Sequence, residues 1–450
     1  MMTEAQYSVE RVVRESESSH VMVGVTDIDG VIRGKYIDKE KLLSCLAGGT
    51  SICRVVFGWD SRDNLYSNDY TGWFNGFPDD GLRVVPETMR TIPFENTPFF
   101  LADFTGEGAK LCPRNLASRV IERAAQSGLT VKGGFEYEFY GFKETVESAR
   151  AKRFRNLVPL TATTGGYSVL RSNVHTEFFH GLLALAEALD TPIEGLHPEA
   201  GEGALEYALS PSEGLQCADR AAIFKTFSKA WGQRNNVLLS YMAKPVANLP
   251  GCGGHLHLSL WGKGSTPLFY DAGMEGSLSD TGRHFVGGQQ RYMAELLAMT
   301  TPTVNAFTRL APGYWAPTAA SWGFDNRTCA IRVVGSSPKS TRVEYRVTSA
   351  DANPYLVLAA ALASGLAGIE QKLEPTAPSR GNAYDETAPE TLRFPRTLHD
   401  AAGRLHGSGM AREWFGDPFV EHFALSREVE EQAFRRHVTD WELERYLEMI

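Results

Sequence analysis

Three short segments of the chain alternate charged and apolar residues with a period of two, the pattern of a β-strand with two unlike faces. They read GFEYEF at 134–139, GHLHLSL at 254–260 and RVEYR at 342–346. Alternation puts the polar residues of each segment on one face and aromatic or aliphatic residues on the other. The polar sets are Glu136 with Glu138, His255 with His257, and Arg342 with Glu344 and Arg346.

The pattern before residue 110 predicts a small mixed unit. Residues 21–36 indicate two strands joined at Asp29-Gly30, a strong hairpin signal. A short helix over 40–46 follows, then a polar loop over 61–78 and strands over 53–60, 82–85 and 99–103. A glycine-containing connector at 105–113 marks a boundary. We expect one domain over 1–109 and another over 110–450.

The pattern after residue 110 predicts a larger α+β unit. A helix over 114–127 stops at Gly128, as helices commonly do. Strands are expected over 131–142 and 253–261, and helices over 173–188, 215–236 and, in the charged tail, 426–449. The stretch 145–172 is basic and then rich in Thr and Gly, which favours a mobile surface loop.

Composition excludes several classes of function. The 450 residues carry a net charge of -9, which argues against a nucleic-acid surface. Six scattered cysteines without a CxxC pair fit a reducing cytoplasm better than a disulfide framework or a zinc site. The N-terminus has no signal-peptide pattern, and no apolar run is long enough for a membrane span. We therefore expect a cytoplasmic protein without a nucleic-acid or membrane partner.

Cations gather in one partly apolar stretch, residues 305–355. The guanidinium fork suits carboxylate and phosphate, so arginines held among apolar residues indicate an anion site. An alternative for RVEYR is a salt-bridged strand in which Glu344 only neutralises its two arginines. The cations are Arg309, Arg327, Arg332, Lys339, Arg342 and Arg346.

Carboxylates on one strand face indicate a metal site. Glu136 and Glu138 repel each other, and a divalent cation such as Mg²⁺ or Mn²⁺ removes that cost. Hydrated glutamates on an exposed sheet, and core histidines at 255 and 257, are the alternatives. With Glu199, Glu206, His255 and Glu344, the set suffices for two metals with three ligands each. Two metals and several arginines suit phosphoryl transfer, and no GxxxxGK[ST] motif is present. The residues thus predict a metal-dependent, ATP-using enzyme.

The order of these motifs resembles the glutamine synthetase family. The resemblance runs from DIDGVIRGK at 27–35 to WELERY at 441–446. It rests on GFEYEF, the Glu199/Glu206 segment, GHLHLSL, NAFTRLAPGYWAP, NRTCAIR, SPKSTRVEYR and ANPYL. It implies an N-terminal β-grasp-like domain and a catalytic α/β domain with a half-barrel antiparallel sheet. It also implies two stacked hexameric rings with active sites between neighbouring subunits.

The resemblance also implies residue roles. One metal would be held by Glu138, Glu199 and Glu206, and a second by Glu136, His255 and Glu344. ATP, the co-substrate, would contact Glu194, His257, Ser259, Arg327, Arg332, Lys339 and Arg342. Arg309 and Arg346 would bind the glutamate carboxylate, with Gly251 near its amino group, and Arg327 would stabilise the transferred phosphoryl group. Asp60, or Asp63 as a fallback, would serve the neighbouring subunit's ammonium site.

One departure from the family pattern concerns the nitrogen donor. The residue after PGY is a glutamate in glutamine synthetases but Trp315 here. An indole cannot take a proton, although it can line an organic pocket or bind a cation through its π face. An aromatic residue here is similar to the γ-glutamyl-amine ligase branch, such as γ-glutamylputrescine synthetase. Pro250 and residues 203–205 also differ from the family pattern, and Tyr384 lacks the acidic-proline context of an adenylylated tyrosine.

Three hypotheses follow. The first is an ATP-dependent ligase that joins the γ-carboxylate of glutamate to an amine through a γ-glutamyl phosphate. The second is a glutamine synthetase that uses ammonia despite Trp315. The third is a non-catalytic scaffold, as in lens relatives such as lengsin. Aromatic residues in the loop 61–78 favour a small apolar amine.

Overall fold

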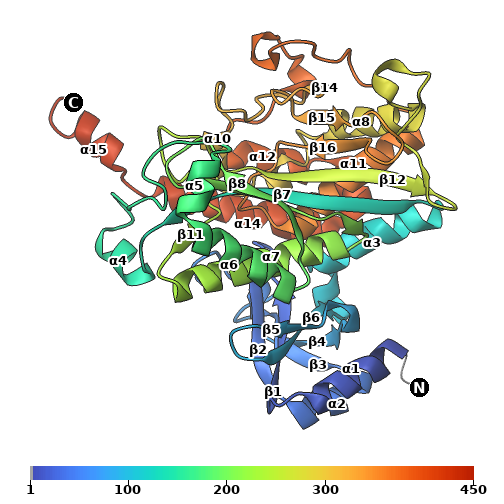
Figure 1. Ribbon diagram of the computed structural model, residues 1–450, viewed down its shortest axis with the longest axis vertical. Helices are drawn as coiled ribbons and strands as arrows, with labels where there is room; N and C mark the ends of the chain where they lie inside the picture. The colour runs from blue at the N-terminus through green and yellow to red at the C-terminus, as the bar shows by residue number, and fades with distance from the viewer. Residues whose placement is uncertain (1–3) are drawn as a thin grey trace.

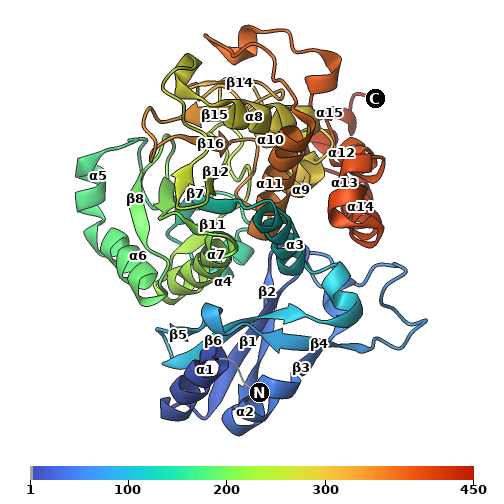
Figure 2. The ribbon, with the colours of Figure 1, turned by 90° about the vertical axis from the view of Figure 1, so that its right-hand side faces the viewer.

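The computed structural model describes residues 4–450 and has a small N-terminal unit beneath a larger one (Figures 1 and 2). The small unit is built around a sheet of six strands. Its elements are α1 (Glu4–Glu15), β1 (His20–Thr26), β2 (Ile32–Asp38), α2 (Lys39–Gly48), β3 (Thr50–Cys53), η1 (Arg54–Phe57), β4 (Asp79–Val84), η2 (Pro86–Thr88), β5 (Arg90–Ile92), β6 (Thr97–Phe104) and η3 (Gly106–Lys110).

The N-terminal sheet has the order β2-β1-β6-β4-β3, with β5 added to β6. The predicted hairpin is confirmed, since β1 and β2 pair antiparallel from His20↔Asp38 to Thr26↔Ile32. β1 lies parallel to β6, and the other pairs are antiparallel. Gly30 in the hairpin turn has φ +82°, and an added Cβ would lie 3.1 Å from the Asn353 Cα. Glycine is therefore needed here both for the turn and for the contact with the larger unit.

The predicted strand over 53–60 is wrong. β3 ends at Cys53, and residues 54–57 form the 3-10 helix η1. Its sequence RVVF places the apolar residues Val56 and Phe57 side by side, and both are buried. A two-sided strand would expose one of them, whereas a helical turn packs both against the core.

The larger unit follows, and the helix predicted at its start is confirmed. It contains α3 (Pro113–Gln126), β7 (Thr130–Phe142), α4 (Val146–Ala151), α5 (Val169–Val174), α6 (Thr176–Ala188), β8 (Ile193–Pro198), β9 (Ala204–Leu209), β10 (Ser212–Glu213), α7 (Gln216–Arg234), β11 (Leu238–Ser240), β12 (Gly254–Gly262), β13 (Thr266–Pro267), η4 (Glu275–Ser277), α8 (Asp280–Tyr292), α9 (Leu297–Thr300), α10 (Val304–Arg309), β14 (Trp322–Phe324), β15 (Ile331–Val334), β16 (Arg342–Tyr345), α11 (Pro354–Gln371), η5 (Ala383–Asp385), η6 (Glu390–Leu392), α12 (Leu398–His406), α13 (Gly409–Phe415), α14 (Asp417–Arg435) and α15 (Asp440–Tyr446).

A ten-stranded sheet organises this unit. Its main order is β14-β15-β16-β12-β7-β9-β8; the short strands β10 and β11 pair with β7, and β13 pairs with β12. All pairs are antiparallel except β14 with β15. The helices α3, α7 and α11 gather beside the sheet (Figure 2), and α11 is buried over nearly its whole length. No helix among the described residues is long and apolar enough to cross a membrane.

Two predictions in this unit need correction. The stretch 145–172 is not a continuous loop, because it contains the short helices α4 and α5, each capped at its start by a Thr or Ser side chain. The tail is not a single helix either. α14 ends at Arg435, and α15 starts anew behind the Thr439 cap, so that it projects from the body (Figure 1).

Polar side chains buried between the two units tie them together. Arg427 of α14 pairs with Asp29 at 2.6 Å, and the Asn353 amide donates to the Asp27 carbonyl at 2.9 Å. His422, also on α14, places its Nε2 at 2.8 Å from the Phe57 carbonyl oxygen and 3.2 Å from the Tyr66 hydroxyl. Burial lowers the pKa of His422 to about 4. The imidazole is therefore neutral in the folded protein.

This histidine predicts a loss of stability in acid. Its folded pKa lies below the ordinary value of 6.5, so the unfolded chain binds one more proton as the pH falls from 6.5 towards 4. We expect His422→Gln, which does not titrate, to cost about 2 kcal/mol less stability at pH 5 than at pH 7. Urea unfolding at both pH values measures this difference, and an equal cost would contradict the assignment.

Candidate active site

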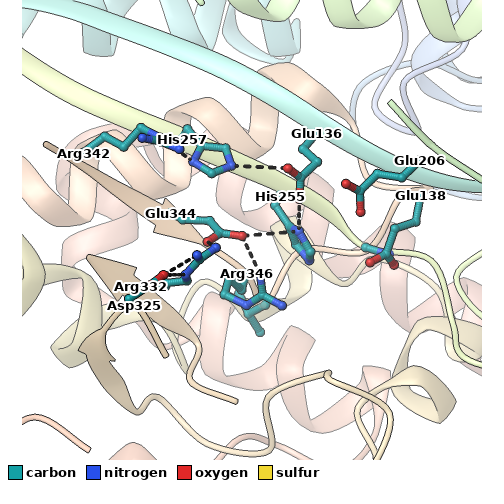
Figure 3. Close-up of polar contacts among 12 residues, drawn as sticks. Glu136, Glu138, Glu206, His255, His257, Asp325, Arg332, Arg342, Glu344 and Arg346 are labelled. Carbon is teal, nitrogen blue, oxygen red and sulfur yellow. Dashed lines mark hydrogen bonds and ion pairs between the residues drawn. The ribbon is translucent and has the colours of Figure 1, made fainter. Parts of the chain in front are cut away.

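Strand register brings the polar residues of five strands into one row across the large sheet. His255 of β12 lies opposite Glu136 of β7, and His257 lies opposite Glu344 of β16. On the other side of β7, Glu138 is opposite Glu206 of β9, which is opposite His197 of β8. Period-two alternation then turns these side chains to a common face. Residues more than 200 positions apart in the chain thereby form one site (Figure 3).

The first group in this row consists of Glu136, His255 and Glu344, whose ligand atoms lie within 4.8 Å of one another. The His255 Nδ1 is 3.0 Å from a Glu136 oxygen and 3.5 Å from a Glu344 oxygen. Glu344 also accepts from Arg332 at 3.0 Å and from Arg346. The sequence pattern placed Glu344 between Arg342 and Arg346. In the structure Arg332 takes the place of Arg342, which donates to His257 Nδ1 at 3.1 Å.

Positive partners keep both carboxylates of this group ionised. Burial opposes the charge on Glu136, but hydrogen bonds from His255 and His257 outweigh it and hold the pKa well below its ordinary value. Burial likewise opposes the charge on Glu344, and the nearby Arg346 lowers its pKa to about 2. Oxygen and imidazole donors in this state suit a divalent cation.

The second group consists of His197, Glu199 and Glu206, again with ligand atoms within 4.8 Å. The His197 Nε2 is 3.1 Å from a Glu206 oxygen, and its Nδ1 is 3.5 Å from a Glu199 oxygen. Glu138, predicted as a ligand beside Glu199 and Glu206, is not a member of this group. It accepts a hydrogen bond from the Gly253 amide, although its carboxylate points towards Glu206 (Figure 3).

Among the described residues, the ion-pair partner of Glu199 and Glu206 is His197 and not an arginine. Burial, together with the charges of Glu136, Glu138 and Glu199, raises the pKa of Glu206 to about 7. Burial and the charges of Glu138 and Glu136 also raise the pKa of Glu199. A bound cation would relieve both effects, because it replaces the proton as the source of positive charge. The donor sets of both groups therefore fit divalent metals such as Mg²⁺ or Mn²⁺.

Four members of the two groups line a cavity of about 620 Å³: Glu136, His255, Glu199 and Glu206. Arg327, Arg332 and Arg346 also line it, so cations and the acidic row share one cavity. Tyr314 and Trp315 form an aromatic part of the wall, and a second cavity, of about 640 Å³, lies beyond Trp315 and Arg327. The cavity therefore joins a polar, metal-binding face to an aromatic rim.

Two of the three residues expected to bind glutamate line this cavity, and Arg309 lies behind them. Arg309 is buried and donates to the carbonyl oxygens of Val347 at 3.0 Å and Arg346 at 3.3 Å. Arg346 and Gly251 line the cavity directly. A Cβ on Gly251 would lie 2.5 Å from the Ala243 carbonyl oxygen, so only glycine fits there. The Tyr140 hydroxyl donates to the Pro250 carbonyl oxygen at 2.8 Å and fixes the backbone just before Gly251.

The residues expected to bind ATP are spread more widely. His257 and Arg342 lie together at one end of the row, and Ser259, two positions further along β12, accepts from the Trp261 indole at 2.9 Å. The Arg332 guanidinium forms ion pairs with Glu344 and Asp325. Glu194 and Lys339 are exposed, and neither lines the cavity of about 620 Å³.

Asp60 does not reach this cavity in its own chain. Its carboxylate accepts hydrogen bonds from the Arg62 amide at 2.8 Å and the Asn64 amide at 2.9 Å within the N-terminal unit. The fallback residue Asp63 pairs with Arg33 at 2.6 Å. Both acids stabilise their own loop, and their role in a neighbouring subunit stays a prediction.

Two residues at the site were missed in the sequence. His197 stands two positions before Glu199, the same i, i+2 spacing that singled out the other ligand strands. Tyr167 stacks on the His197 ring with centroids 4.2 Å apart and also lines the cavity. It belongs to the Thr- and Gly-rich stretch expected to be a surface loop. The Tyr167 backbone amide donates to the Pro198 carbonyl oxygen at 2.8 Å. Sequence periodicity does not indicate this contact.

Comparisons with known proteins agree with this geometry. Residues 110–446 match the family described as glutamine synthetase, catalytic domain. Over 97% of its length the chain is 42% identical to a type-1 glutamine synthetase from Dictyostelium discoideum, covering 85% of that protein. It is 37% identical to a glutamate–isopropylamine ligase from a Pseudomonas species, over 96% of this chain and 95% of the ligase. It is also 35% identical to a γ-glutamylethanolamide synthetase from Streptomyces coelicolor, over 96% and 93%.

A solved structure titled "Apo GmaS without ligand" superposes with a TM-score of 0.85 at 25% identity, covering 100% of both chains. The likeness confirms the mixed α/β fold and its curled, half-barrel sheet. Fold, motif order and sequence identity agree over almost the whole length. The chain belongs to the glutamine synthetase family.

Proposed function

We propose that the protein is an ATP-dependent ligase that joins the γ-carboxylate of glutamate to an amine and makes a γ-glutamylamide. The observation that carries this proposal is Trp315 on the cavity wall, where the family pattern of glutamine synthetases has a glutamate. The names of the relatives that act on isopropylamine and form an ethanolamide support an amine acceptor.

The first half of the reaction uses the polar face of the cavity. A γ-carboxylate oxygen of glutamate attacks the terminal phosphorus of ATP, and ADP leaves. Arg346 and Arg309 would hold the substrate's α-carboxylate, and Arg327 would bind the phosphoryl group in transfer. Divalent cations held by the two acidic groups, with Glu138 completing the group of Glu199 and Glu206, would neutralise charge on the phosphates.

The second half uses the aromatic rim. The neutral amine nitrogen attacks the γ-carbonyl carbon, the bond to phosphate oxygen breaks, and the amine loses a proton as phosphate leaves. Trp315 offers an apolar surface to the amine's substituent and its π face to the ammonium form before deprotonation. Tyr167 and Tyr314 enlarge this surface. Such a wall favours small apolar amines over ammonium, which has no substituent to bury.

A glutamine synthetase that uses ammonia is the second candidate, because the 42% identical relative carries that name. Glu199 and Glu206 near Tyr167 could attract ammonium without a glutamate at position 315. A lengsin-like scaffold is disfavoured, since all six predicted metal ligands line or adjoin one cavity.

The wider organisation of the protein forms part of the proposal. We place the domain boundary at residues 109 and 110, which is supported by the start of the family match at 110. The parallel pairing of β1 with β6 beside an antiparallel hairpin supports a β-grasp-like N-terminal domain. Our proposal also includes two stacked hexameric rings in the cytoplasm, with Asp60 serving the next subunit, as the family resemblance implies.

The first prediction concerns the reaction itself. With ATP, Mg²⁺ and glutamate, we expect phosphate release and γ-glutamylamide formation with small mono-amines, and little with ammonium. Phosphate assay and mass spectrometry of the product measure both, across ammonium, alkylamines, ethanolamine and diamines. Ammonium as the best acceptor would favour the glutamine synthetase alternative.

The second prediction concerns Trp315. Trp315→Glu restores a carboxylate that attracts and deprotonates ammonium, so we expect kcat/KM for ammonium to rise by about tenfold or more relative to the best amine. Trp315→Leu is the matched control, because it removes the indole without adding a base. A rise in both variants, or in neither, would contradict this role of Trp315.

The third prediction concerns the second acidic group. Glu206→Gln removes a charged oxygen ligand, so we expect Mn²⁺ affinity, measured by electron paramagnetic resonance titration, to fall by about tenfold or more. Activity should fall with it. Glu202→Gln, in the exposed turn of the same hairpin, is the control. Equal Mn²⁺ binding by both variants would exclude Glu206 as a ligand.

A further inference from the structure

The wall that carries Trp315 is a loop between α10 and β14. It spans residues 310–321, and only near its end, at Ala319, does the described structure give it a β-bridge, to Arg393. Trp315 itself has φ +60°, in the left-handed region that non-glycine residues rarely adopt, and its side chain is 58% exposed. Its conformation must therefore be imposed by neighbouring groups.

Tyr384 of the short helix η5 supplies such a contact. Its hydroxyl donates to the Ala316 carbonyl oxygen at 3.0 Å, directly after Trp315. Burial raises the pKa of Tyr384 above its ordinary value, while Arg346, Arg309 and the backbone amide of Trp315 act in the opposite direction. The hydroxyl thus stays protonated near neutral pH and remains a donor.

The segment that carries Tyr384 is fixed by hydrogen bonds to the two residues that flank Arg327. Asn326 donates to the Gly381 carbonyl oxygen at 2.8 Å, and the Thr328 hydroxyl accepts from the Ala383 amide at 3.0 Å. Arg327 between them lines the cavity next to Trp315. These hydrogen bonds, with the backbone between them, therefore connect the residues flanking Arg327 to the loop that carries Trp315.

We propose that Tyr384 is a positioning residue that latches the Trp315 loop over the acyl phosphate, so that the amine rather than water reaches the γ-carbonyl carbon. This inference rests on the proposed ligase function. With the latch closed, the amine nitrogen forms the new bond and phosphate leaves. With the latch open, a water oxygen attacks the same carbon, which releases glutamate and phosphate without amide.

The test compares Tyr384→Phe, which removes only the hydroxyl, with Tyr292→Phe as the matched control. Tyr292 also loses one hydroxyl contact, to Gln371 at 2.9 Å, but on α8, away from the site. We expect Tyr384→Phe to release more phosphate than amide and to lose about 3- to 10-fold in kcat/KM for the amine, the value of one neutral hydrogen bond. The KM for ATP should stay unchanged. Wild type and control should form phosphate and amide in equal amounts.

Hydrogen exchange of the full-length protein, followed by mass spectrometry, tests the latch without relying on turnover. Amides over residues 312–318 should exchange faster in Tyr384→Phe than in wild type or Tyr292→Phe. Equal exchange, or equal phosphate and amide in the variant, would overturn the proposal. If wild type makes no amide with any acceptor, the proposed function fails, while the exchange experiment still decides whether Tyr384 fixes the Trp315 loop.

Discussion

Repulsion among carboxylates on adjacent strands is the constraint around which this molecule is arranged. Register places Glu136, Glu138 and Glu206 as neighbours on one face of the large sheet, and Glu199 joins them from the β8–β9 turn. Arginine and histidine neutralise one end of the row, at Glu344 and Glu136. The other end keeps an excess of negative charge, which the raised pKa values of Glu199 and Glu206 express. A bound cation would neutralise this excess negative charge, so this end of the row is a candidate cation site.

The opposite face of the same strands keeps the carboxylates from moving apart. Phe135, Tyr137 and Phe139 are fully buried there, and Tyr137 and Phe139 both pack against the Tyr207 ring of β9. Lys225 of α7 lies 5.0 Å from the Tyr137 ring centre and donates to the Ala350 carbonyl oxygen at 2.6 Å. Close packing on this side fixes the spacing of the strands. Moving the carboxylates further apart would require the packed aromatic side chains to separate, which costs free energy.

The sequence predicted those parts of the structure that depend on local alternation. The strands 131–142 and 253–261 and the hairpin at Asp29-Gly30 are confirmed, because each strand has two faces that its own residues specify. The adjacent apolar residues Val56 and Phe57 do not alternate with polar residues, so the pattern did not distinguish a 3-10 helix from a strand, and the helix was missed. One partner of Glu344 was also mispredicted: Arg346 pairs with it as expected, but Arg332 replaces Arg342 through the pairing of β15 with β16. Register between distant strands, the contact of Tyr167 with His197 and the break before α15 depend on tertiary packing, which period-two patterns do not record.

The two halves of the proposed reaction rest on different kinds of structure. Most of the residues proposed to bind metal and ATP lie on strands, where register and packing fix their positions. The acceptor wall of Tyr314 and Trp315 lies on a loop, whose residues can change without disturbing the strand row. Family members named for ammonia and for different amines would then share the acidic row and differ at the wall. This division explains how one residue, at position 315, changes the expected nitrogen donor while the metal ligands stay in place.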